Sequence, residues 1–291
     1  MGSAASYLLK IDQPMGWLWK IITNKKTLAI ALAVGSIASA NATTVIYESF
    51  SDSDGTLDGN TPGTGLSGTW TSTGATVTSP TLTYGDLPNA GGQANTAGND
   101  TISYITTSAL FDAGLLTDGA TLWFSFMTSG ATGSGNHSGF GLGTTNVKSA
   151  FNGLNMAGDG IGFYKRDGKA TGWKDGAKSA FSDSIGISTG AELIVGKVVW
   201  GAGAASETIT IYNPSTTGPI TQPLTFVSTT VDGFDQTALN TISFSSRGGD
   251  QVWDEIRFGD SFESVVTAVP EPSSTALLGL GGLALILRRR K

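Results

Sequence analysis

The carboxylates are the first candidates for chemistry, because two carboxyl groups at a fixed separation can hydrolyse a glycosidic bond. A β-strand presents such a pair when the acidic residues alternate, since every second side chain enters the same cleft. Here the one acidic pair on a predicted strand is Asp254–Glu255, and adjacent strand residues point to opposite faces. Glu48 and Asp52 are four residues apart, but Asp52 lies in a predicted turn. We therefore expect no catalytic residues of this type.

A candidate metal site lies in SDSDGTLDGN, residues 51–60. It offers hard oxygen ligands of the kind that Ca²⁺ uses, namely Asp52, Asp54, Asp58 and Asn60. The spacing departs from the EF-hand pattern, because Gly63 stands where the bidentate Glu would be. Asp/Gly clusters also form turns in which side chains bond their own backbone, so a calcium site and a plain turn both remain open.

A candidate binding segment is KRDGKATGWKDGAK, residues 165–178. Around Trp173 it gathers five of the nine Lys and Arg residues found between positions 43 and 268: Lys165, Arg166, Lys169, Lys174 and Lys178. An indole ring stacks on sugar rings, and cationic side chains bind uronate or sulfate. The segment therefore predicts a site for an anionic polysaccharide. The alternative is an exposed hairpin whose charges serve solubility, and only the binding site requires an exposed, fixed Trp173.

Composition excludes several other classes of function. Residues 43–268 carry nine Lys and Arg against 21 Asp and Glu, a net charge of -12, which repels phosphate backbones and argues against nucleic-acid binding. The chain has no cysteine, so disulfides and Cys-bearing zinc sites are excluded. Its single histidine, His137 in GSGNHSGFG, excludes a multi-histidine metal site and is expected in a solvated loop.

The N-terminal 42 residues have the order of a secretory signal peptide, which implies export through the Sec translocon. Lys20, Lys25 and Lys26 precede an apolar run from Leu28 to Ile37. Small residues follow at Ala38 and Ala40, so we expect cleavage after Ala40 or after Ala42. Met1 and Met15 both remain open as the start of translation.

The C-terminus, residues 269–291, combines three segments in a fixed order. Val269, Pro270, Glu271 and Pro272 come first, then the apolar run 276–287, then Arg288, Arg289, Arg290 and Lys291. As a helix the apolar run is about 18 Å long, short of the roughly 30 Å hydrocarbon core. The terminal positive charges stay cytoplasmic, so residues 43–268 are expected outside the membrane.

This C-terminal order resembles the PEP-CTERM sorting signal of exported bacterial proteins. The resemblance implies transient anchoring in the inner membrane and recognition by an exosortase that acts near Pro270 to Pro272. It also implies a Gram-negative-type envelope, a final location at the cell surface or in the extracellular matrix, and a link to exopolysaccharide. A permanent C-terminal anchor is the alternative.

Between the two ends the sequence predicts an all-β domain, residues 43–268. Alternating or apolar segments predict strands at 43–50, 121–127, 192–200, 207–212, 241–246 and 252–258, with the longest interrupted at Gly196. One short helix is expected at 260–266, where Asp260 and Glu263 have capping-box spacing. About eleven or twelve strands without a repeat favour one large two-sheet antiparallel sandwich.

Five segments, at 47–70, 82–88, 121–126, 209–215 and 253–266, resemble in that order the concanavalin A-like lectin/glucanase domains, some of them LamG-like. The resemblance implies a jelly-roll sandwich, a fold shared by lectins, adhesion modules and glycoside hydrolases. Because no carboxylate pair is evident, we expect a non-catalytic, polysaccharide-associated or lectin-like surface or biofilm-matrix protein without a cofactor, apart from the calcium that remains open. The alternative is a secreted glycan-degrading enzyme.

Overall fold

The computed structural model describes residues 42–96, 101–130, 133, 135–144, 160–174, 184–202, 207–214, 219–223, 226–231 and 235–267. The chain divides into two compact units, 1–41 and 42–291. The predicted signal peptide, apart from Ala42, and the predicted sorting tail lie outside the described residues. All of the described residues belong to the second unit.

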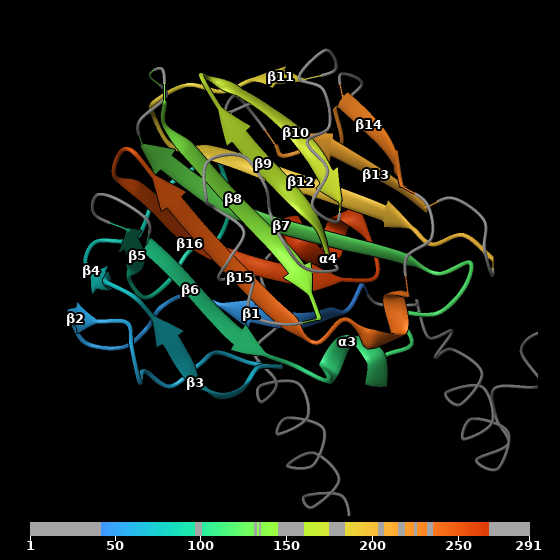
Figure 1. Cartoon of the computed structure of the whole chain (residues 1–291), viewed down its shortest axis with the longest axis horizontal. Coiled ribbons are helices and arrows are strands. Elements are labelled where there is room, and N and C mark those ends of the chain that lie inside the picture. Colours follow the sequence, from blue (N-terminus) through green and yellow to red (C-terminus); the bar gives the residue numbers. More distant parts are fainter. Residues whose placement is uncertain are drawn as a thin grey trace, which may run out of the picture. The chain divides into compact units, whose positions relative to one another are not determined.

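The described residues form two antiparallel sheets that face each other (Figure 1). The first, of nine strands, runs in the order β14 (Phe226–Val231), β13 (Glu207–Tyr212), β12 (Glu192–Val199), β7 (Thr121–Gly130), β16 (Gln251–Gly259), β5 (Gln93–Thr96), β4 (Ala75–Thr78) and β2 (Gly55–Thr56), and β1 (Thr44–Glu48) also pairs with β16. The second, of seven strands, runs in the order β11 (Ile185–Gly186), β10 (Lys169–Lys174), β9 (Gly160–Arg166), β8 (His137–Gly143), β15 (Thr241–Arg247), β6 (Thr101–Thr106) and β3 (Ser67–Ser72). The predicted all-β, two-sheet sandwich is confirmed.

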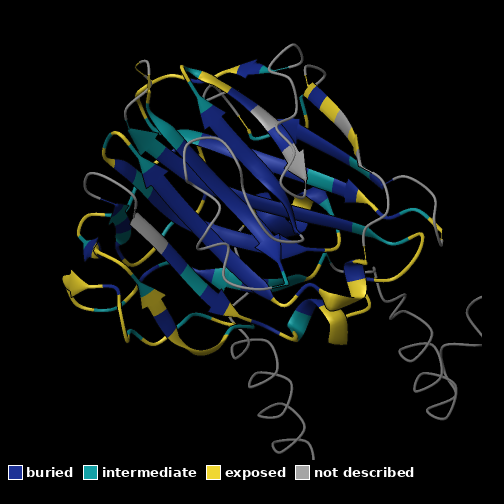
Figure 2. Ribbon diagram, viewed as in Figure 1, coloured by how far each residue is buried: buried dark blue, intermediate teal, exposed yellow. Residues whose placement is uncertain are grey.

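The main core lies between the sheets, as expected from alternation along the strands. On β7, Leu122, Phe124 and Phe126 point inward and join the main cluster, while Trp123 and Met127 point outward. Phe140 of β8 packs on Phe126 with ring centroids 4.4 Å apart. Figure 2 shows that the centres of both sheets are buried and that exposure is concentrated at the rim.

Gly196 does not interrupt β12, contrary to the sequence prediction. It pairs with Phe124 of β7 and with Ile211 of β13, and the strand continues to Val199. A Cβ atom at this position would overlap the ring of Phe124. The glycine therefore makes room for an aromatic side chain on the neighbouring strand, and does not mark a turn.

The outer face of the nine-stranded sheet carries a second apolar cluster. Trp123 and Met127 pack there with Tyr84 and Leu87 of the β4–β5 loop and with Phe262 of α4 (Phe262–Val266). The predicted helix is confirmed as an element but its cap is different, because Ser261 and Ser264 form the capping box. Asp260 instead accepts a hydrogen bond from the Thr43 amide at 2.9 Å. Two further short helices, α3 (Ala109–Asp112) and η1 (Gln236–Ala238), were not predicted.

Candidate functional site

The strand register gathers basic side chains into one row across four strands of the seven-stranded sheet. Lys169 of β10 pairs with Arg166 of β9, Arg166 pairs with His137 of β8, and His137 pairs with Arg247 of β15. We call these four residues the basic row. Neighbouring strands lie about 4.8 Å apart, so the row is about 14 Å long.

All four residues of the basic row lie on the outward face of the sheet. Phe163, Phe140, Phe244 and Ala170 belong to the core between the sheets, one on each of the four strands. Side chains alternate along a strand, and every member of the row is an odd number of positions from the core residue of its own strand. The members of the row therefore point away from the core. Lys169 is exposed, and Arg166, His137 and Arg247 are partly exposed.

A tyrosine hydroxyl lies at the centre of the row. Tyr164, two positions before Arg166, places its hydroxyl 2.5 Å from Nδ1 of His137, and the two rings stack with centroids 6.0 Å apart. Burial raises the pKa of Tyr164 to about 12, and the charges of Arg166 and Arg247 pull it the other way. The charges of both guanidinium groups therefore act on the same hydroxyl.

His137 differs from the sequence prediction of a solvated loop residue. It is the first residue of β8 and is held by Tyr164. The prediction was wrong because the surrounding glycines in GSGNHSGFG indicate a flexible loop, whereas Gly139, Gly141 and Gly143 are strand residues on the same face as His137. These glycines are buried, whereas His137, at the start of the strand, is partly exposed.

A tight turn sets the position of Arg166 beside Lys169. Asp167 and Gly168 have φ values of 51° and 72°, as in the Asp-Gly turns that join hairpin strands. The carboxylate of Asp167 accepts a hydrogen bond from Arg166 Nε at 3.0 Å, with both side chains more than a third exposed. The turn and this ion pair together hold the guanidinium group at the end of the hairpin.

The structure separates Lys165 from the other predicted binding residues. Its side chain points between the sheets and is 1% exposed, with Nζ 3.3 Å from Oε1 of Gln251. Burial lowers the pKa of Lys165 to about 8. Lys165 therefore cannot contact a ligand at the surface, contrary to its assignment to an exposed cluster. Trp173 and Lys174 lie in β10, where only their backbone is described, and Lys178 is outside the described residues.

The acidic pair Asp254–Glu255 does not follow ordinary alternation. Between Asp254 and Arg257 the pairing with β7 shifts register, and Glu255 has a φ of 51°. This β-bulge turns both carboxylates toward the β4–β5 loop, so the prediction of opposite faces was wrong. Asp254 Oδ2 accepts hydrogen bonds from Thr81 Oγ1 at 2.5 Å and the Leu82 amide at 2.7 Å. Glu255 Oε1 accepts one from the Ala90 amide at 2.8 Å.

Although they face the same loop, the two carboxylates are closed off from solvent. Both residues are fully buried, and Glu255 Oε2 is 2.6 Å from Nη2 of Arg257. Burial raises the pKa of Asp254 to about 7 and raises that of Glu255 as well. Arg257 also donates to the carbonyls of Pro88 and Thr267. The three charged residues hold a loop and the end of the domain against β16.

Glu48 has a similar structural role. Its oxygens accept hydrogen bonds from the amides of Phe50 and Gly63 at 2.7 and 2.8 Å and from Nε1 of Trp70 at 3.0 Å. Burial raises its pKa, while these three donors pull it down. Asp52 lies near enough to add a small repulsion, but Glu48 is turned into the protein and is 3% exposed.

Three of the four candidate calcium ligands accept hydrogen bonds within the protein. Asp54 accepts a hydrogen bond from Ser79 Oγ at 2.9 Å, and Asp58 accepts one from the Ser72 amide at 2.9 Å. The Asn60 carbonyl accepts from the Trp70 amide at 3.1 Å. Among the described residues, no three acidic or histidine side chains lie close enough together to hold a metal ion. Asp54, Asp58 and Asn60 thus hold neighbouring segments of the chain together, and the calcium site stays a prediction.

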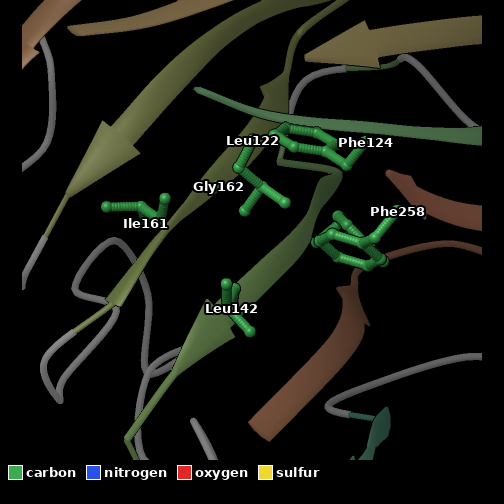
Figure 3. A pocket seen from close by; sticks show the side chains of 7 residues that line it. Leu122, Phe124, Leu142, Ile161, Gly162 and Phe258 are labelled. Atoms are coloured by element: carbon green, nitrogen blue, oxygen red, sulfur yellow. The ribbon is translucent and has the colours of Figure 1, made fainter. Parts of the chain in front are cut away.

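A small apolar packing defect, too small to admit a water molecule, lies between the sheets (Figure 3). It is lined by Leu122, Phe124, Phe140, Leu142, Ile161, Gly162 and Phe258. No polar side chain lines this space, so it has nothing to orient a sugar or an ion. The gap belongs to the packing of the core.

The described residues thus define a class by their fold, an all-β sandwich of two antiparallel sheets. Similar solved structures include a carbohydrate esterase of the Shiga toxin-encoding bacteriophage phi24B, with 16% identity, TM-score 0.41, and 76% of this chain and 100% of that one covered. The CBM2 module of the evolved Dit of Lactobacillus casei BL23 phage J-1 is 14% identical, with TM-score 0.39 over 74% and 97% of the two chains. Peanut lectin is 10% identical, with TM-score 0.36 over 61% and 90%. These likenesses concern the fold alone.

A second comparison concerns the end of the chain. Residues 268–291 match the family described as the PEP-CTERM protein-sorting motif, which confirms the resemblance seen in the sequence. The motif implies an exported protein that an exosortase sorts to the cell surface. No curated protein matches the chain. Within the part that the structure describes, no helix is long and apolar enough to cross a membrane.

Proposed function

We propose that the protein is a non-catalytic component of the cell surface or extracellular matrix, and that its sandwich binds an anionic extracellular polysaccharide at the basic row. The signal peptide directs it through the Sec translocon, and the C-terminal apolar segment anchors it transiently in the inner membrane until the exosortase acts.

The observation that carries the proposal is the basic row in an acidic domain. Three permanent cations and one histidine stand on adjacent strands, in a region whose net charge is -12. A polyanion lying across Arg166, His137 and Arg247 would accept charge-assisted hydrogen bonds from these side chains.

The engagement of the carboxylates supports a non-catalytic role. Glycoside hydrolysis requires an acid and a base that reach the same sugar. Glu48, Asp254 and Glu255 are each 3% exposed or less and accept hydrogen bonds from the protein itself. Neither a sugar nor an attacking water can reach these groups without opening the fold.

The experiment is a binding measurement on the purified full chain in non-ionic detergent, with acidic and neutral polysaccharides. Arg247→Ser removes one charge from the basic row and leaves a residue type that β15 already carries at Ser243 and Ser245. The matched control is Lys197→Ser, which removes a lysine on the other sheet, where its Nζ lies 5.5 Å from the Trp123 ring.

We expect the protein to bind acidic polysaccharides and not neutral ones. Arg247→Ser should abolish this binding, and Lys197→Ser should leave it unchanged. Addition of a calcium chelator should leave the affinity unchanged. Equal loss in both variants would show that net charge, and not the basic row, attracts the polymer. A shortening of the polysaccharide during incubation would refute the non-catalytic assignment.

A further inference from the structure

A buried polar layer lies between the two sheets, next to the aromatic part of the core. Phe140 of β8 packs on Phe126 of β7, with ring centroids 4.4 Å apart. Two positions further along these strands, the inward residues are Ser138 and Thr128. Lys165 of β9 pairs with Ser138 in the register and also points inward. Ser138, Lys165 and Thr128 are each at most 1% exposed, so this layer is closed to solvent.

A glutamine amide from the opposite sheet is fixed in this layer. Gln251 of β16 donates from Nε2 to Thr128 Oγ1 at 3.0 Å and also to the Ser129 carbonyl. Thr128 Oγ1 in turn donates to the Val252 carbonyl at 2.9 Å. Because Nε2 is held by these two acceptors, it is Oε1 of Gln251 that faces Lys165, at 3.3 Å from Nζ.

Two donors in the layer are poorly satisfied. An ammonium group has three donors. Lys165 Nζ makes two contacts, at 3.3 Å to Gln251 and 3.5 Å to the Gly130 carbonyl, both longer than usual N–H···O bonds. Among the described residues, the buried Ser138 hydroxyl has no hydrogen-bond partner. Ser138 and Lys165 are directly opposite on neighbouring strands, with Cβ atoms about 5 Å apart, so one acceptor between them would satisfy both.

The positive charge of Lys165 also has no carboxylate beside it. In the part of the chain that the structure describes, Lys165 forms no ion pair. Burial lowers its pKa to about 8, and the charge of Glu192 acts in the opposite direction. The Glu192 carboxylate accepts hydrogen bonds from the Ser188 amide at 3.0 Å and from Asn213 Nδ2 at 3.2 Å. The basic row lies on the outer face of the same sheet and adds further positive charge. Buried charges are costly without a partner, so an anion is favoured here.

We propose that this layer binds one small monovalent anion of the size of chloride, held between Lys165 Nζ and Ser138 Oγ. A water molecule would accept both hydrogen bonds but leave the charge unpaired, whereas an anion does both. The bound anion would strengthen the contact between the two sheets, because Lys165 reaches from β9 to Gln251 of β16. This site is separate from the proposed polysaccharide site, since it lies on the inner side of the sheet.

The test is urea unfolding of the full chain in non-ionic detergent, while chloride is exchanged stepwise for gluconate at constant total salt. Gluconate is too large to enter a closed layer, so the exchange separates binding from screening. A ligand that binds only the folded state stabilises it with the logarithm of ligand concentration. A tenfold increase in chloride above its dissociation constant should therefore raise the urea midpoint by about 0.5 M. Bromide should replace chloride in this effect.

Two variants test the assigned donors. Lys165→Met should abolish the chloride dependence, because it removes the charge and keeps a long apolar side chain. Ser138→Ala should require about tenfold more chloride for the same midpoint, since one hydrogen bond to a charged partner is lost. Lys197→Met is the matched control, because it removes a lysine of the other sheet, whose Nζ lies 5.5 Å from the centre of the Trp123 ring. Its chloride response should equal that of the unchanged protein.

The outcomes separate a bound anion from a general effect of salt. A midpoint that does not change with the chloride fraction would overturn the inference and leave a water molecule as the acceptor. An undiminished chloride response in Lys165→Met and in Ser138→Ala would assign the effect to another place and overturn it as well. If Lys165→Met does not fold, the response of Ser138→Ala decides. Polysaccharide binding is measured separately and stands or falls by itself.

Discussion

The buried ion pair between Glu255 and Arg257 allows a quantitative prediction about stability. The two charged groups are 2.6 Å apart with side chains 0% and 1% exposed. The guanidinium carbon of Arg257 lies 5.2 Å from the centre of the Tyr47 ring, and its nitrogens donate to the carbonyls of Pro88 and Thr267. Arg257→Met would leave the Glu255 carboxylate buried without its countercharge and remove donors from both carbonyls.

Removing one partner of a buried ion pair costs about 3–5 kcal/mol, against a total stability of about 5–15 kcal/mol for a folded domain. We expect Arg257→Met to lower the free energy of unfolding by that amount. The double variant Glu255→Gln/Arg257→Met should be no less stable than Arg257→Met, because the unpaired charge is gone.

The assay is urea unfolding followed by tryptophan fluorescence, which the seven tryptophans of the chain permit. The control is Arg166→Met, which removes an exposed arginine from its 3.0 Å pair with Asp167. That change should cost about 0.2–1 kcal/mol. The reasoning fails if Arg257→Met costs no more than Arg166→Met, or if the effects of Glu255→Gln and Arg257→Met simply add.

Asp254, Gly196 and the sorting tail each give a further prediction. Burial raises the pKa of Asp254 to about 7, so the folded state holds a proton that the unfolded chain releases near pH 4. The stability that comes from this bound proton is fully present below pH 4 and is lost as the pH rises through 7. The difference between the urea midpoints at pH 5 and pH 8 should therefore be smaller in Asp254→Asn than in the unchanged protein. Gly196→Ala should destabilise by about 1–3 kcal/mol in the same assay, because its Cβ would overlap the Phe124 ring, and a neutral effect would contradict that packing. Glu271→Ala, or deletion of residues 288–291, should leave the domain folded but stop its delivery to the cell surface, as followed by fractionation; normal delivery of both variants would contradict the assigned sorting role.

Elements defined by local alternation could be predicted from the sequence. Strand β13 has the predicted bounds, 207–212, and β7 and β16 extend the predictions by a few residues, because inward and outward side chains differ in polarity along each strand. The bulge in β16 could not be predicted in this way. The positive φ of Glu255 accompanies bonds to Tyr47, Ala90 and Arg257, two of which are distant in sequence.

The pairing register of the strands decides which side chains lie together in the candidate site, and a single sequence does not show that register. Proximity along the chain suggested a cluster at 165–178, but Lys165 turns inward. Arg247 joins the row from a strand some eighty residues further on, because β8 lies between β9 and β15. The ends of HSGFGLG and TISFSSR each carry a basic outward residue, but only the pairing of those strands places them side by side.

The pairing of β1 with β16 has a mechanical consequence. Thr44 at the start of β1 lies opposite Gly259 at the end of β16, and the carbonyl of Thr267 accepts a hydrogen bond from Arg257 in the same strand. The first and last described residues therefore leave the domain at one place. Tension between the two ends would open the β1–β16 ladder from Thr44 inward, one hydrogen bond at a time, while the basic row on the other sheet carried none of the load.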